Sequence, residues 1–401
     1  MAHQDGLSEW TAQVSSNLPQ LSKPQATLLA WWSYAIVMVR GCGRTTVATF
    51  LALLLGRKAE SLNRRLREFS YEPQAKSGAK RGICRRALEV DSCFAPLLAW
   101  VLRLWQGRTL ALAIDASTLS NRFALLAVSV VYRGCAIPVA WAIVPVQFKG
   151  AWRRHWLRLL RLLRPAVPAD YKVLVLADRG LYARWLFRRI ARLGWHPFLR
   201  VRRGCTFQPR GQQRWLPMAE LVPKVGCQWS GRGEAFKSKK SRLSCTLLAC
   251  WAEGSSEPWY VLSTLDVERA EVAWYGLRSW CEQGFKVLKR GAWQWQHTRV
   301  LKPERAERLL LALAVATLWM LSVGGELEDE VAVLELPEAV AALLTPGRGR
   351  KRRVRLLRLA LLWLLVCLLR GKPLPMPKRL VPEPWPKREV CSSPPPAGAL
   401  S

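Results

Sequence analysis

Residues 109–201 alternate apolar runs with helix-like stretches, and this order constrains the fold more than any other feature of the sequence. Two strand-like runs meet at Arg133-Gly134, which predicts a hairpin. Further strands are expected at TLALAID, YKVLVLA and HPFLRV, and amphipathic helices at AWRRHWLRLLRLL and YARWLFRRIARLG. Strand, hairpin, helix, strand, helix, strand is the order of an α/β fold.

The regions on either side of this core have a different texture. Helical patterns fill the first hundred or so residues, while the stretch from Cys205 alternates short β-prone runs with Gly, Ser and Lys. Helical character returns at Val267, and the C-terminal tail is rich in proline. We therefore predict a helical N-terminal region (1–105), an α/β core in two parts (106–204 and 267–325), a β-rich insertion (205–266), a helical C-terminal region (326–370) and a disordered tail (371–401).

The charge of the chain is strongly one-sided. Lys and Arg number 62 against 28 Asp and Glu, a formal net charge of +34, while 50% of the residues are hydrophobic. The apolar fraction predicts a folded protein, and the excess of positive charge favours a polyanionic partner, with nucleic acid foremost. A ribosomal or membrane-surface protein remains the alternative, since charge alone does not separate these classes.

Cysteine and histidine usage argues against disulfides and zinc. The 11 cysteines form no Cys-x-x-Cys pair, and the 4 histidines have no metal-ligand spacing. We expect reduced thiols in a cytosol. No membrane association is expected, because the N-terminus lacks a signal pattern and the apolar run 359–369 is shorter than the roughly 20 residues of a membrane span. That run is expected to be a buried or docking helix.

Two aspartates occupy matching positions in the predicted core. Asp115 ends the apolar run LALAID, and Asp178 ends VLVLAD. Strand ends meet at the carboxyl edge of an α/β sheet, and a buried carboxylate there needs a partner such as a divalent metal ion. The alternatives are an N-cap or turn acid, or an ion pair between Asp178 and Arg179.

A third acid, Glu282, lies in the basic segment YGLRSWCEQGFKVLK. On one α-helix, Tyr275, Arg278, Glu282 and Lys289 would project within an arc of roughly 60°. A carboxylate beside two cations and a phenol suits a metal and phosphate site. A solvated helix face with i,i+4 charge pairs fits the same pattern.

The N-terminal region carries its own basic helix, NRRLREF. Arg64, Arg65 and Arg67 are candidates for contacting DNA ends, and a solvated helix face is the alternative for each.

The spacing Tyr275-x2-Arg278-x3-Glu282-x6-Lys289 resembles the Tyr-Arg-Glu-Lys signature of DDE transposases of the insertion-sequence family four group. AIDAST around Asp115 and LADRGLY around Asp178 resemble the first and second aspartate segments of that group. The resemblance covers about residues 30–325. It implies a ribonuclease-H-like mixed sheet with helices, interrupted by the β-rich insertion and flanked by helical N- and C-terminal regions.

The resemblance also implies a chemistry for these residues. Asp115, Asp178 and Glu282 would bind two divalent ions, Mg²⁺ or Mn²⁺, for in-line phosphoryl transfer. Tyr275, Arg278 and Lys289 would hold DNA phosphates. Trp229, in the insertion, is the candidate for holding a flipped base, with core packing as the alternative.

A transposase of this kind would take the inverted-repeat ends of its element and target DNA as double-stranded substrates, and would act as a homodimer on DNA. Two alternatives remain: a ribonuclease-H-like structure-specific nuclease without strand transfer, and a non-catalytic DNA-binding protein derived from a transposase. All three acids are present, which argues against the second.

Overall fold

The computed structural model describes residues 2–76, 86–146, 152–330 and 355–387. The chain divides into two compact units, which are described separately. Unit 1 comprises Met1–Gly107, Ala116–Ala169 and Trp280–Glu383, and unit 2 comprises Arg108–Asp115, Asp170–Ser279 and Pro384–Ser401.

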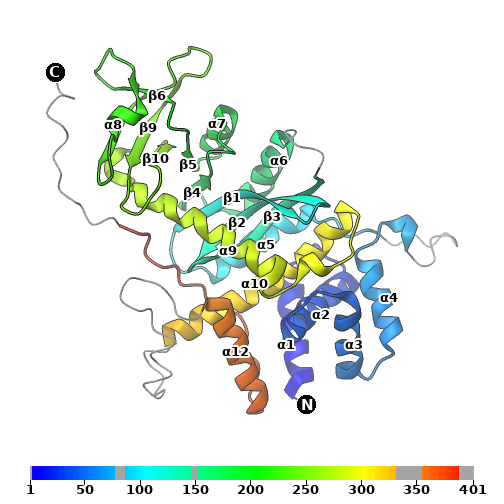
Figure 1. The fold of residues 1–401 in the computed structure, drawn as a ribbon. Helices are drawn as coiled ribbons and strands as arrows, with labels where there is room; N and C mark the ends of the chain where they lie inside the picture. Colours follow the sequence, from blue (N-terminus) through cyan, green and yellow to red (C-terminus); the bar gives the residue numbers. More distant parts are fainter. Residues whose placement is uncertain (1, 77–85, 147–151, 331–354, 388–401) are drawn as a thin grey trace. The chain divides into compact units, whose positions relative to one another are not determined.

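The N-terminal part of unit 1 is helical, as predicted (Figure 1). Its helices are α1 (Ala2–Asn17), α2 (Lys23–Val39), α3 (Arg44–Leu55), α4 (Ala59–Phe69) and α5 (Asp91–Leu104). Local sequence signals explain their ends. A Ser22/Gln25 capping box precedes α2, and α3 stops at Gly56, whose φ of 62° is the left-handed conformation that glycine adopts without strain.

Aromatic rings pack these helices onto one core. Trp10 of α1 stacks on Trp319 with ring centres 4.4 Å apart, and Trp100 of α5 and Tyr34 of α2 lie against the same pair. All four side chains are buried. Much of the chain's tryptophan therefore serves as packing, where large rings bury the most apolar area.

Unit 1 also contains the hairpin predicted at Arg133-Gly134. Strands β2 (Phe123–Tyr132) and β3 (Cys135–Pro145) pair with each other, and β2 also pairs with β1 (Thr109–Leu119), in the order β3-β2-β1. The hairpin turn has positive φ at both residues, 42° at Arg133 and 79° at Gly134, as a tight two-residue turn between twisted strands requires. Every residue of β2 is buried, so this part of the sheet is covered on both faces.

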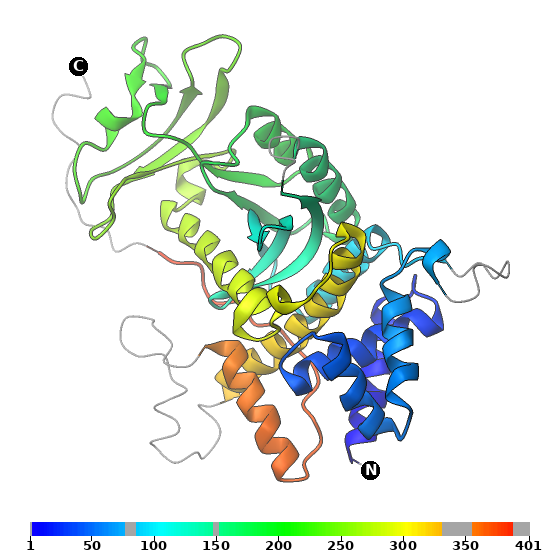
Figure 2. The same cartoon turned by 45° about the vertical axis from the view of Figure 1, so that its right-hand side comes forward.

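Helices α6 (Arg153–Leu163), α9 (Ser279–Lys286), α10 (Pro303–Glu330) and α12 (Leu356–Leu369) belong to unit 1, except that Ser279 is assigned to unit 2. Figure 2 shows α12 lying beside α10.

The Pro303–Asp329 helix has the length and hydropathy of a membrane span, yet 94% of its most apolar window is buried inside the structure. Core helices of globular proteins have the same composition. The bent pair of α2 and α3 passes the same test only if taken as one span.

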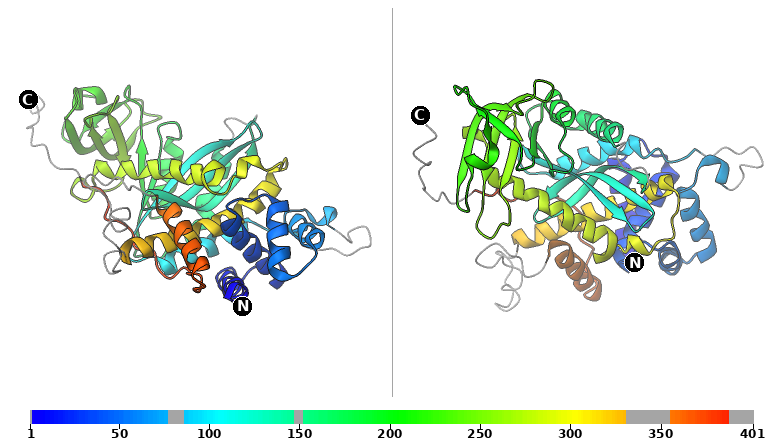
Figure 3. Two further views of the ribbon diagram at one scale, coloured as in Figure 1. Left: turned by 60° about the horizontal axis from the view of Figure 1, so that its bottom comes forward. Right: turned by 45° about the horizontal axis from the view of Figure 1, so that its top comes forward.

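Unit 2 is built on strands in the order β1-β4-β5-β10-β9-β8-β6-β7. Strand β1, through Thr109–Ile114, pairs in parallel with β4 (Lys172–Ala177), which pairs in parallel with β5 (His196–Arg200); the remaining pairings in this order are antiparallel. The latter strands are β6 (Thr206–Pro209), β7 (Leu216–Pro217), β8 (Gln228–Ala235), β9 (Leu243–Cys250) and β10 (Trp259–Ser263), and the helices are α7 (Arg184–Arg192) and α8 (Met218–Leu221) (Figure 3). The predicted α/β class, a mixed sheet with helices, is confirmed.

The predicted single helix through residues 275–289 differs from the structure. A 3-10 helix, η5 (Val272–Arg278), precedes α9, and a π-helical turn, η6 (Val287–Gly291), follows it. The four signature residues therefore do not follow a uniform 100° per residue, and the prediction of one α-helix through them is wrong.

Part of the predicted disordered tail is packed. Leu374, Met376 and Leu380 are at most 5% exposed, and Leu380 forms a parallel bridge with Trp105. The indole N–H of Trp319 donates to the Pro375 carbonyl at 2.8 Å. Apolar residues spaced among the prolines anchor this stretch, whereas residues 388–401 of the predicted tail and 331–354 of the predicted C-terminal region lie outside the described residues.

Candidate active site

The parallel pairing of β1 with β4 brings two of the predicted acids together in unit 2. The register aligns Ile114 with Ala177, so Asp115 and Asp178 are the next residues along neighbouring strands. Asp178 directly follows β4, as expected. Asp115 does not end its strand, because β1 continues to Leu119.

One arginine contacts both carboxylates. The guanidinium of Arg278 lies 3.2 Å from Asp115 Oδ2 and 3.5 Å from Asp178 Oδ2. The hydroxyl of Tyr275 donates to Asp178 Oδ1 at 3.3 Å. Side chains three residues apart eclipse one another in a 3-10 helix, and η5 therefore presents Tyr275 and Arg278 on the same side.

The four groups are partly shielded from water. The side chains of Arg278 and Asp115 are 15% and 17% exposed, and that of Asp178 is 35% exposed. Burial lowers the pKa of Arg278, but the neighbouring Asp115, Tyr275 and Asp178 outweigh it and raise that pKa above its usual value. Burial, with the charge of Asp178, raises the pKa of Tyr275 to about 12, so its hydroxyl stays protonated as a donor.

The surroundings of Asp178 include two residues that the sequence did not indicate. The ion pair between Asp178 and Arg179, considered as an alternative, is not what the structure has: the Arg179 backbone N–H donates to the Asp178 carboxylate, while the Arg179 guanidinium pairs with Glu257 at 2.7 Å. Trp259 packs edge-on against Tyr275 with ring centres 5.1 Å apart. Glu257 and Trp259 both lie in EPWYVLS, a segment whose sequence indicates a strand and no functional site.

The other two residues of the predicted signature belong to unit 1. Glu282 is exposed on α9, and Lys289 lies in the π-helical turn, where its ammonium donates to Ser117 Oγ at 2.5 Å. Ser117 is two residues beyond Asp115.

The N-terminal arginines have different environments. Arg64 and Arg67 are exposed on α4, whereas Arg65 lies over the Trp31 ring at 5.3 Å, and burial lowers its pKa. Arg67 lies 5.8 Å from the ring centre of Tyr71.

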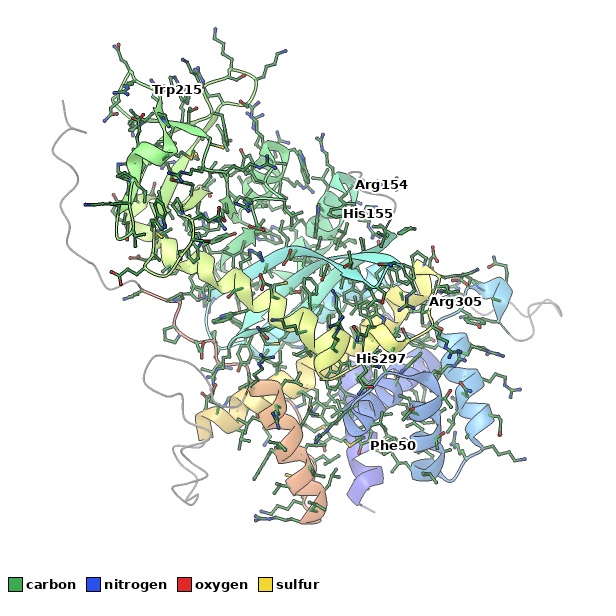
Figure 4. All side chains as sticks on the ribbon, in the orientation of Figure 1. Phe50, Arg154, His155, Trp215, His297 and Arg305 are labelled. Atoms are coloured by element: carbon green, nitrogen blue, oxygen red, sulfur yellow. The ribbon has the colours of Figure 1, made fainter. Side chains whose placement is uncertain are left out.

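Trp229, in β8 of unit 2, is half-buried and packs edge-on against Phe207 at 5.5 Å. A Cβ at Gly231 would lie 2.6 Å from the Trp229 ring, so the indole packs closely against that glycine. In the same unit, the guanidinium carbon of Arg242 lies 5.1 Å from the ring centre of Trp215, which is labelled in Figure 4.

The donor set around Asp115 and Asp178 suits a hard cation. Within the part of the chain that the structure describes, no three His, Cys, Asp or Glu side chains gather as a metal site. Two partly exposed carboxylates nevertheless face one shared positive group, Arg278, and oxygen ligands of this kind are those that Mg²⁺ and Mn²⁺ prefer. The pair therefore fits a divalent ion.

The fold is a mixed α/β sheet that brings two aspartates together, and the chain is strongly positive. These features are typical of the class of proteins that carry out chemistry at nucleic-acid phosphates. The family profile described as "Transposase DDE domain" matches residues 109–319, more than half of the chain. The chain belongs to this family of transposases. No curated protein matches it.

Solved structures were compared as well. One similar structure is the cryo-EM synaptic complex of piggyBac transposase with hairpin DNA. The two share 10% sequence identity with a TM-score of 0.39, and the alignment covers 90% of this chain and 77% of that one.

Proposed function

We propose that this protein is a DNA transposase that cuts an insertion-sequence element at its inverted-repeat ends and joins the 3′-hydroxyl ends to target DNA. The observation that carries the proposal is the pair of aspartates, Asp115 in β1 and Asp178 directly after the neighbouring parallel strand β4, inside the region that matches the family. The Tyr-Arg-Glu-Lys spacing supports assignment to the insertion-sequence family four group.

In this proposal Asp115, Asp178 and Glu282 are the carboxylates that hold divalent ions. Members of the family generally use such ions; Mg²⁺ or Mn²⁺, two per site, would activate the attacking oxygen and stabilise the leaving oxygen at phosphorus. The carboxylates orient the reacting groups in line, and no covalent bond between protein and DNA is needed. The contacts of the first two acids support their roles, and that of Glu282 rests on the resemblance.

Cationic and hydrogen-bond-donating side chains of the signature would position the DNA strand. Arg278 suits a phosphate because its planar fork matches two oxygens, and Lys289 would act as a point charge. Tyr275, protonated at ordinary pH, can donate to a phosphate oxygen as it does to Asp178. Trp229 stays a candidate for holding a flipped base, and Arg64, Arg65 and Arg67 for contacting the element ends.

The partners follow from the reaction. Two element ends must be processed together, so we propose a homodimer on double-stranded DNA, located in the bacterial-type cytoplasm. The net charge of +34 supports double-stranded DNA, a polyanion, as the partner.

A strand-transfer assay tests the proposal. Purified protein is incubated with Mg²⁺, a supercoiled target plasmid and a pre-cut duplex that carries the inverted repeat flanking the reading frame. We expect joined product with the wild type. Asp178→Asn and Glu282→Gln should lower it by at least about 100-fold, because each removes a metal-binding charge, while binding of the duplex is retained.

Glu253→Gln is the matched control, since it neutralises an exposed acid of unit 2 without contact to the aspartate pair. Cleavage of an uncut end without joining would favour the structure-specific nuclease. Duplex binding with neither reaction would favour the non-catalytic DNA-binding protein.

A further inference from the structure

Arg278 stands where a cation that binds the aspartates would stand. Its guanidinium reaches Asp115 at 3.2 Å and Asp178 at 3.5 Å, and it bridges carboxylates from two separate strands. The position is well supported, because Tyr275 of the same 3-10 helix is 4% exposed and is fixed by Trp259.

In the protein without bound ions, the bridge reduces the repulsion between the two carboxylates. Two carboxylates on adjacent strands repel each other, and their partial burial strengthens that repulsion. The guanidinium neutralises part of this charge and so stabilises the strand ends in their paired arrangement.

The same contact competes with ion binding. A divalent ion needs the oxygens that Arg278 contacts, at about 2.0–2.6 Å, and two cations at such short range repel strongly in a partly buried site. Arg278 therefore has to withdraw from at least one carboxylate when the ion binds, and its fork is then available for an anionic group.

We propose that Arg278 is the resident counter-ion of the aspartate pair, which it holds together before ion binding and leaves when a divalent ion binds, so that its guanidinium passes to a DNA phosphate. The inference rests on the proposed function, since it assigns the regulation of ion entry to the same site. Arg278 would thus couple ion binding to the grip on DNA, and ions and DNA would favour each other's binding.

Direct measurement of Mn²⁺ binding by electron paramagnetic resonance, without DNA, tests this step independently of catalysis. Full-length wild type is compared with Arg278→Ala, Arg278→Gln and Arg278→Lys. Removal of the competing charge should tighten the Mn²⁺ Kd about tenfold or more in the first two variants. The lysine variant keeps the charge and should stay within about threefold of the wild type.

Arg179→Ala is the matched control for general field effects. Arg179 is adjacent to Asp178 in sequence and carries the same charge, but its guanidinium pairs with Glu257. Tightening in Arg278→Ala without comparable tightening in Arg179→Ala supports a counter-ion in place. Unchanged or weaker Mn²⁺ binding in both Arg278→Ala and Arg278→Gln, or equal tightening in Arg179→Ala, overturns the inference and leaves the proposed function standing.

A second measurement needs no variant that might misfold. Wild-type protein is treated briefly with phenylglyoxal, an arginine reagent, and the modified peptides are quantified by mass spectrometry. Arg278 should be modified faster with Mn²⁺ present than without it, and an unchanged rate overturns the inference. Failure of the wild type to bind Mn²⁺, or binding by Asp178→Asn as tight as that of the wild type, overturns the proposed metal site together with the inference.

Discussion

Glu307 is a carboxyl group of α10 that makes the stability of unit 1 depend on pH. Its Oε1 accepts the backbone N–H of Ile143, in β3, at 2.8 Å. Burial raises its pKa from 4.5 to about 7; the Ile143 N–H and Arg158 oppose this rise, while Asp91 and Glu304 add to it. An acid whose pKa is higher in the folded state binds more protons there than when unfolded, so its contribution is most favourable at low pH.

Stability should therefore fall as pH rises from about 4.5 to 7, by about 3 kcal/mol from this group alone. Glu307→Gln keeps an acceptor for Ile143 and removes the charge, and it should flatten this part of the profile. Urea unfolding midpoints at pH 5 and pH 7.5, at one ionic strength, provide the measurement. A variant whose midpoint changes with pH as much as that of the wild type would contradict the prediction.

The residues of the candidate site differ in how far the sequence alone indicates them. Asp115 and Asp178 are predictable because an acid after an apolar run is rare and the runs are strands. The contacts of Arg278 are not predictable, since they depend on a 3-10 turn at Val272–Arg278 in place of an α-helix. Glu257 and Trp259 escape detection because only the pairing of β10 with β5 brings them near Asp178.

Elements of unit 1 approach each other closely at two consecutive glycines of α10. A Cβ on Gly324 would lie 2.5 Å from the carbonyl oxygen of Leu356, at the start of α12. Gly324→Ala should therefore push α12 away from α10 and destabilise unit 1 by about 1–3 kcal/mol, even though alanine is the better helix former.

Thermal unfolding compares this variant with Gly204→Ala, where no heavy atom beyond the adjoining residues lies within 4 Å of the new methyl group. A lower Tm for Gly324→Ala alone is expected. Equal Tm values for the two variants would show that the helices adjust at no cost.

The stretch that follows α12 has a structural role despite its proline content. Gln106 N donates to the Leu380 carbonyl at 2.8 Å, and Leu380 is fully buried. Truncation after Gly371 would expose the apolar surfaces that Leu374, Met376 and Leu380 cover. We expect a loss of several degrees in Tm. An unchanged Tm in the truncated protein would contradict this assignment.

The element order of the core is predictable because alternation and amphipathicity are local signals. The changes of helix type within residues 272–291 are not predictable from local signals. Ala292 N and Trp293 N both donate to the Val287 carbonyl at 3.1 Å, and this wider turn is set by the packing of Trp293, which is fully buried. The sequence also gives no sign that residues 374–381 bind back to unit 1, because proline content suggests disorder while the anchoring leucines are few.

For the whole molecule, charge sets the conditions under which any DNA complex forms. The net charge of +34 is spread over both units, and each contact of an Arg or Lys with a phosphate releases counter-ions from the duplex. Affinity for a duplex without the inverted repeat should fall by about 10³–10⁵ between roughly 50 and 200 mM salt if about 6–10 phosphates are neutralised. Fluorescence anisotropy over that range gives the slope of log Kd against log salt.

The variants locate this charge within the molecule. Arg64→Ala with Arg67→Ala should reduce the slope by about 1–2 if both exposed arginines of α4 contact phosphate. Arg305→Ala is the matched control, because Arg305 stacks on Tyr71 and pairs with Glu72. An equal reduction in the control would mean that the slope reports overall charge, in which case α4 would lose its assignment as a DNA-contacting element.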